Sequence, residues 1–169
     1  MTKAYMIIDL QFGSTGKGLL AGYLAKRLEP DVVATAWSPN AGHTYIDENG
    51  RKFVHCMLAN SIVSPNLTTV LIGAGSTLDL DLLYKEIESC ADLLRHKTII
   101  IHPHAAVVTQ AHRDIEKRNV KIGSTMKGSG ASAIQRMERD PDNNPTVVAQ
   151  TDIDWLNKVH ELGIHIVVD

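Results

Sequence analysis

The stretch from residue 5 to residue 28 constrains the fold most, because it joins three patterns in one order. An apolar run, Tyr5-Met6-Ile7-Ile8-Asp9, is followed by the glycine-rich segment Gly13-Ser14-Thr15-Gly16-Lys17-Gly18 and then by leucines at helical spacing. A strand, a glycine turn and a helix entry in this order present backbone N–H groups and one ammonium to a single point. The pattern predicts a strand over 5–9 that leads through a phosphate-binding loop into a helix.

This loop departs in two places from the common phosphate-loop pattern G-x-x-x-x-G-K-S/T. Gln11 stands where the first glycine is expected, and Gly18 replaces the hydroxyl residue that binds magnesium in that pattern. An ordinary strand-to-helix turn with a solvated Lys17 is the alternative. Three glycines within six residues favour the phosphate loop, so we predict a phosphate loop of a variant kind.

The rest of the chain alternates between strand and helix patterns, which is typical of a parallel sheet covered by helices. Further strands are predicted over 32–37, 70–72, 98–101 and 164–169. Helices are predicted over 79–94, up to about residue 139, and from 151 to 163. Asn49-Gly50 between two short apolar runs predicts a β-hairpin. The predicted fold class is therefore α/β: a P-loop-like three-layer fold with a largely parallel central sheet flanked by helices and a β-hairpin insertion.

Composition bounds the class of protein. The 169 residues suffice for a single α/β domain, and the formal net charge of −2 gives no electrostatic footprint for nucleic acid or an anionic membrane. No apolar run reaches the length of a membrane span, and no secretory signal pattern stands at the N-terminus, so a cytoplasmic protein is expected. Cys56 and Cys90 are expected to be core thiols, and the spacing of His102, His104 and His112 matches no zinc template.

Two more loops carry polar groups that are suited to nucleotide chemistry. Pro39-Asn40-Ala41-Gly42-His43-Thr44 offers an amide, an imidazole and a hydroxyl around one turn, although a purely structural β-turn is the alternative. Gly123-Ser124-Thr125-Met126-Lys127-Gly128-Ser129-Gly130 is rich in glycine, hydroxyl groups and lysine. It is a candidate for a second phosphate site, and a flexible surface loop explains the same composition.

Taken together, these loops resemble the adenylosuccinate synthetase family in order and spacing. The segments here read G-S-T-G-K-G, N-A-G-H-T and G-S-T-M-K-G, where the family reads G-D-E-G-K-G, N-A-G-H-T and G-T-T-G-R-G. The resemblance runs from about Tyr5 to Arg139 and covers the N-terminal portion of the family. We therefore expect residues 1–169 to form a single nucleotide-binding α/β domain, the N-terminal portion of a longer synthetase.

The resemblance implies a reaction and a set of site residues. In the family, a nucleoside triphosphate phosphorylates the 6-oxygen of a purine nucleotide, and the amine of L-aspartate then displaces the phosphate. Lys17 and the loop amides would hold the transferred phosphoryl group, and His43 would stabilise charge on the transferring oxygen. The implied catalytic residues are Ser14, Lys17 and His43. The implied triphosphate-binding residues are Gly13, Ser14, Thr15, Gly16, Lys17, Gly18, Gly42, His43 and Thr44. The implied substrate-nucleotide residues are Ser14, Asn40, Thr125 and Arg139, and Ser14 and the Gly42 carbonyl would bind Mg²⁺. Arg139 would reach into the partner's site, so a homodimer is expected, with no direct nucleic-acid partner and no membrane.

Ser14 is the main departure from the family, which has an aspartate there that acts as a base and a metal ligand. A serine hydroxyl is a poor base near neutral pH and a weaker metal ligand. With Gln11-Phe12 and Trp37-Ser38-Pro39, it resembles the phage-type branch that joins L-aspartate to dGMP and forms N6-succino-2-amino-2'-deoxyadenylate. That branch is expected to use ATP or dATP. The alternatives are an ordinary adenylosuccinate synthetase that acts on IMP with GTP, and a non-catalytic P-loop nucleotide-binding module.

Overall fold

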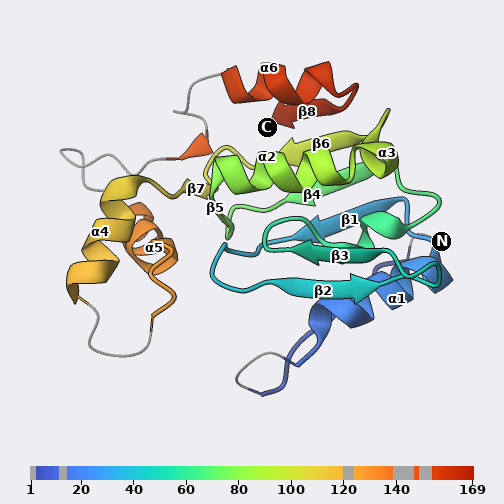
Figure 1. Ribbon diagram of the computed structural model, residues 1–169, viewed down its shortest axis with the longest axis horizontal. Coiled ribbons are helices and arrows are strands. Elements are labelled where there is room, and N and C mark those ends of the chain that lie inside the picture. The colour runs from blue at the N-terminus through green and yellow to red at the C-terminus, as the bar shows by residue number, and fades with distance from the viewer. Residues whose placement is uncertain (1–2, 12–14, 120–123, 139–146, 149–153) are drawn as a thin grey trace.

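A four-stranded parallel sheet forms the centre of the computed structural model, which describes residues 3–11, 15–119, 124–138, 147–148 and 154–169 (Figure 1). In spatial order its strands are β1 (Val32–Thr35), β4 (Thr69–Ile72), β6 (Thr98–Ile101) and β8 (His165–Val168). Val70, Ile99 and Ile166 stand side by side in register and are almost fully buried. Buried and partly exposed residues alternate along β4 and β6, because successive side chains point to opposite faces of a sheet.

Helices flank this sheet, as the alternating pattern predicts. The described helices are α1 (Lys17–Leu28), the 3-10 helix η1 (Asn60–Val63), α2 (Leu80–Ser89), α3 (Ala91–Leu94), α4 (Gln110–Asn119), α5 (Ser129–Glu138) and α6 (Asp154–Glu161). Figure 1 shows α2 and α3 along β4 and β6, and α4 with α5 beside one end of the sheet. The predicted 79–94 helix is divided into α2 and α3 at Cys90. The Ser89 hydroxyl donates to the Glu86 carbonyl at 2.8 Å at this break, where it competes with the helical backbone pattern.

The predicted hairpin is confirmed. Strands β2 (His43–Ile46) and β3 (Lys52–His55) pair antiparallel, and Gly50 takes a positive φ of 81° in the turn. The Asp47 carboxylate accepts hydrogen bonds from backbone N–H groups within this turn. Helix α1 packs against β2 and η1, so the hairpin carries the helix that follows the glycine-rich loop. A short parallel pair, β5 (Thr77–Leu78) with β7 (Ala106–Val107), lies where α5 packs.

The predicted strand over residues 5–9 is wrong. Tyr5, Met6 and Ile8 are 61%, 83% and 65% exposed, and residues 3–11 contain no strand. A strand forms only when a neighbouring strand completes its hydrogen-bond ladder. An apolar run in the sequence does not show whether such a neighbouring strand is present. The first residues of the predicted 151–163 helix, 151–153, lie outside the described residues. Within the described part of the chain, every helix is too short or too polar to span a bilayer.

Candidate functional site

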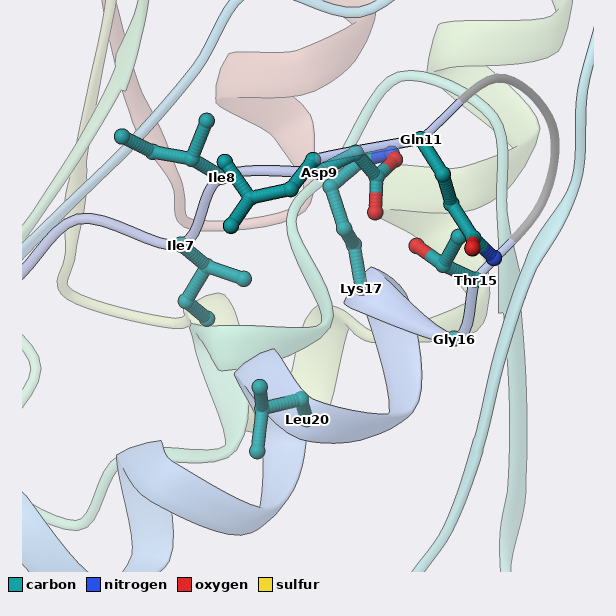
Figure 2. Close-up of a pocket in the computed structure, with 9 residues that line it drawn as sticks. Ile7, Ile8, Asp9, Gln11, Thr15, Gly16, Lys17 and Leu20 are labelled. Carbon is teal, nitrogen blue, oxygen red and sulfur yellow. The ribbon is translucent and has the colours of Figure 1, made fainter.

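The start of α1 is built to receive an anion. Gly16 caps the helix with φ 89°, a backbone conformation that favours glycine, and no side chain in the described chain accepts the N–H groups of the first turn. The first turn holds no acidic residue, so no carboxylate within α1 offsets the positive end of its helix dipole. A cavity of about 360 Å³ opens here, lined among others by Thr15, Gly16 and Lys17 (Figure 2).

An ion pair holds Lys17 at this cavity. Its Nζ contacts the Asp9 carboxylate, which comes from the segment before the loop, and the two side chains are 30% and 19% exposed. Both residues line the cavity in Figure 2. A phosphate entering the loop would therefore compete with Asp9 for the ammonium. The sequence prediction did not include Asp9, although a single acid at the end of an apolar run before such a loop is a recognisable signal.

His43 lies beside the entry of α1. It is the first residue of β2, and its imidazole stacks on the Trp37 ring with centroids 3.7 Å apart and planes 24° apart. Burial, assisted by the positive charge of Lys17, lowers the pKa of His43 below its usual value. The imidazole is therefore neutral near pH 7. Trp37 follows β1 and is fixed there by a hydrogen bond from the Thr77 N–H to its carbonyl at 3.2 Å.

Gly18 permits the close approach of α1 to β2. A Cβ at this position would lie 2.5 Å from the His43 Cβ and 3.0 Å from the Asn60 Nδ2, so any side chain would push these elements apart. The replacement of a hydroxyl residue by Gly18, seen in the sequence as a departure from the common pattern, thus has a packing reason. Lys17, Gly18 and His43 are brought together as one group.

The other residues of the N-A-G-H-T segment are more exposed. The Asn40 Oδ1 accepts a hydrogen bond from the Ser38 hydroxyl at 2.8 Å, which is the local turn bonding that the structural alternative expects. Gly42 is exposed immediately before His43. Thr44 is exposed and pairs with Val54 across the hairpin. Their predicted roles toward the nucleotide and Mg²⁺ stay predictions.

The third loop is already occupied by an internal carboxylate. Glu116 on α4 accepts hydrogen bonds from the backbone N–H groups of Gly128 and Gly130, each at 2.8 Å, at the start of α5. Burial acts to raise the pKa of Glu116, but these backbone hydrogen bonds outweigh it and hold the pKa below the usual value. Thr125 is exposed in this loop and lines neither of the two described cavities. A second phosphate site at Thr125 stays a prediction.

Three predicted site residues, Gly13, Ser14 and Arg139, lie outside the described residues. In the part of the chain that the structure describes, no three or more His, Cys, Asp or Glu side chains group in a way suited to a metal ion. Cys56 and Cys90 are free thiols, the first partly and the second fully buried. His102 and His104 contact each other, whereas His112 bonds Thr109 and Gln135 within the α4–α5 unit.

A parallel α/β sheet, a glycine-capped helix start over a cavity and an adjacent neutral imidazole define a nucleotide-binding α/β protein. Residues 6–158 match the family model of adenylosuccinate synthetase, and the chain belongs to that family. A protein of Salmonella phage PMBT28 named N6-succino-2-amino-2'-deoxyadenylate synthase is 62% identical over 151 residues, which cover 89% of this chain and 41% of that protein. Its namesake in Acinetobacter phage SH-Ab 15497 is 54% identical over 91% of this chain and 40% of the relative.

A solved structure of a further phage protein also matches this chain. The succinoaminodeoxyadenylate synthetase of cyanophage S-2L, bound to dGMP and to dATP as an energy donor, superposes with a TM-score of 0.80 at 40% identity. The match covers 95% of this chain and 44% of the cyanophage chain. The chain thus spans less than half the length of the relatives that it matches. The predicted family and the predicted fold class are confirmed.

Proposed function

We propose that this chain belongs to a C–N bond-forming ligase that joins L-aspartate to dGMP and forms N6-succino-2-amino-2'-deoxyadenylate. The proposal rests on the group formed by the glycine-capped start of α1, Lys17 and a neutral His43. The names of the phage relatives at 62% and 54% identity support the choice of reaction, as does the dGMP in the cyanophage structure.

In the first step, the γ-phosphoryl group of the triphosphate passes to the 6-oxygen of guanine, releasing a nucleoside diphosphate and the N1 proton. Charge spreads over the phosphoryl oxygens during such a transfer, so catalysis consists mainly of positioning and charge neutralisation. The N–H groups at the start of α1 and the Lys17 ammonium supply both at one point. The Asp9 carboxylate holds that ammonium in place before the phosphate arrives.

His43 acts in this step as a neutral hydrogen-bond donor. Because burial and Lys17 lower its pKa, the imidazole carries one N–H near pH 7 and needs no proton from solvent. A neutral imidazole can stabilise a developing oxyanion by donating that N–H. The stacked Trp37 ring limits the rotation of the imidazole.

Mg²⁺ and the second step complete the reaction. The proposed Mg²⁺ ligands are the carbonyl of Gly42, an exposed residue, and Ser14. Mg²⁺ prefers oxygen ligands and keeps few protein ligands when phosphates are present. The ion would neutralise charge on the triphosphate. The aspartate amine then attacks C6 and expels inorganic phosphate.

The proposed donor is ATP or dATP, with Thr15, Gly16, Gly18 and Thr44 around its phosphates. The proposed assembly is a homodimer, in the host cytoplasm, that shares Arg139 across its interface.

Ser14 carries the choice of substrate. Guanine has a 2-amino group next to N1, whereas hypoxanthine has none, and a neutral hydroxyl can accept a hydrogen bond from that group. A site built to bond a polar substrate group disfavours an analogue that lacks it, because its own polar atom is left unpaired. We therefore expect dGMP to exceed IMP in kcat/KM.

The test is a product assay on the full-length protein with dGMP or IMP, L-aspartate, Mg²⁺ and ATP, dATP or GTP in turn. The expected result is a succino-nucleotide from dGMP with ATP or dATP. Ser14→Asp should narrow or reverse the preference. A clear preference of the wild-type protein for IMP would contradict the proposed substrate. No product from either nucleotide would contradict the ligase reaction.

A further inference from the structure

The side chain of Asn60 connects the start of α1 with the strand that carries His43. Asn60 is the first residue of η1 and is completely buried. Its Nδ2 donates to the Gly18 carbonyl on α1 and to the His43 carbonyl on β2, each at 3.2 Å. The two protons of a single amide group thus join α1, which provides Lys17, to β2, which provides His43.

Two buried polar side chains lie near Asn60. Burial lowers the pKa of His55 to about 4, so the ring is neutral near pH 7. Burial also raises the pKa of the Cys90 thiol, which lies 3.3 Å from the His55 Nε2. Neither side chain therefore places a charge next to the Asn60 amide near pH 7.

The contacts of the amide itself determine its orientation. The Asn60 Oδ1 is buried and has no hydrogen-bond partner among the described residues, and the same holds for the His55 Nδ1. A flipped amide would turn Oδ1 toward the two carbonyls, so that acceptors would meet acceptors. The observed orientation therefore points both N–H groups at Gly18 and His43.

Packing makes this connection rigid. A Cβ on Gly18 would lie 2.5 Å from the His43 Cβ and 3.0 Å from the Asn60 Nδ2, so the three residues fill one another's space. Lys17 immediately precedes Gly18, and its charge already reaches the His43 imidazole. Any shift of α1 against β2 would therefore change the separation of the two proposed catalytic groups.

We infer that Asn60 is a positioning residue, which sets the placement of Lys17 and the helix-start N–H groups relative to His43 through its two hydrogen bonds. This inference rests on the proposed function for its kinetic consequence. Its geometric consequence, the distance between Lys17 and His43, does not depend on which substrate the protein uses. Among the described residues, Asn60 donates its hydrogen bonds to the Gly18 and His43 carbonyls, so it acts through other residues.

The experiment compares Asn60→Ala with Ile62→Ala in the full-length protein. Ile62 is a buried residue of the same 3-10 helix, so its truncation controls for the loss of packing at η1. At a temperature well below both unfolding transitions, kcat of Asn60→Ala should fall at least tenfold while KM for L-aspartate stays within twofold. Ile62→Ala should keep kcat within about threefold of wild type. Equal losses in the two variants, or an unchanged kcat in Asn60→Ala, would overturn the inference.

A second readout separates this inference from the proposed function. The NMR cross-peaks between the Gly18 Hα and His43 Hβ protons, which report how closely α1 approaches β2, should weaken in Asn60→Ala because the two hydrogen bonds that join these elements are lost. They should keep their intensity in Ile62→Ala, and equal intensities in all three proteins would refute the positioning role. This holds even if the wild type forms no succino-nucleotide. Asn60→Ser, which keeps one donor, should give intermediate values in both assays and replaces Asn60→Ala if that variant does not fold.

Discussion

Replacing Gly22 by alanine tests how closely α1 must pack on the hairpin. Gly22 is buried in α1, and a Cβ there would lie 2.4 Å from the Tyr45 Cγ and 2.6 and 2.7 Å from the two Cδ atoms. These atoms belong to the rigid base of a buried ring that packs on Phe53, so the ring cannot simply swing aside. Forcing an extra methyl group into a packed core costs about 1–3 kcal/mol. Alanine regains about 1 kcal/mol of helix propensity over glycine.

Contacts as short as 2.4 Å place the cost at the upper end of that range, about 2–3 kcal/mol. The net expectation is therefore a loss of about 1–2 kcal/mol, which for a domain of this size lowers Tm by about 2–8 °C. Thermal unfolding followed by circular dichroism measures this, with Lys26→Ala on the exposed face of α1 as the control. The cost of Gly22→Ala should shrink in a Tyr45→Leu background, because the clashing ring is gone. A Tm for Gly22→Ala that equals or exceeds that of wild type would refute the packing argument.

Three further predictions concern the loops. Lys17→Ala should lower turnover by about 3 kcal/mol of transition-state stabilisation, as for other oxyanion contacts. The acidic limb of the pH profile of kcat should also move to higher pH, because the positive charge that helps to lower the His43 pKa is lost. Unchanged turnover would show that Lys17 does not belong to the phosphate site. Glu116→Gln should cost about 1 kcal/mol of stability after solvent screening. Because the folded pKa of Glu116 is lowered, that difference should be present at pH 7 and disappear as the pH falls through the pKa of the carboxyl group, which denaturant titration at several pH values checks. Mixing Arg139→Ala protein with Lys17→Ala protein should restore part of the activity in heterodimers, and an active enzyme that is strictly monomeric in sedimentation would rule out shared sites.

The sequence predicts the central sheet well because its strands are short apolar runs that end in turn residues. All four strands of the parallel sheet and the Asn49-Gly50 hairpin are confirmed. The run over 5–9 is also largely apolar, and it is not a strand. The difference lies in whether a sheet edge accepts the run, which depends on the rest of the fold rather than on local sequence.

The candidate site divides in the same way. The pattern of glycines around Lys17 and the position of His43 after a turn are local signals, and the structure brings these residues together. Asn60 gives no local signal, because its partners lie 42 and 17 residues away along the chain. Glu116 likewise has no distinguishing signal in the sequence. Its role appears only when the N–H groups at the start of α5 donate to its carboxylate in the folded chain. Contacts of this kind become visible only after the chain has folded.

The spatial order of the parallel sheet has a consequence for biosynthesis. Strands β1, β4, β6 and β8 lie beside one another in the order in which the chain presents them, so each strand joins the outer edge of one that has already left the ribosome. No strand among these four has to wait for a later one or insert between two others. Parallel pairing is slow when distant segments must find each other. A sheet that grows at one edge can instead assemble during translation, one strand at a time.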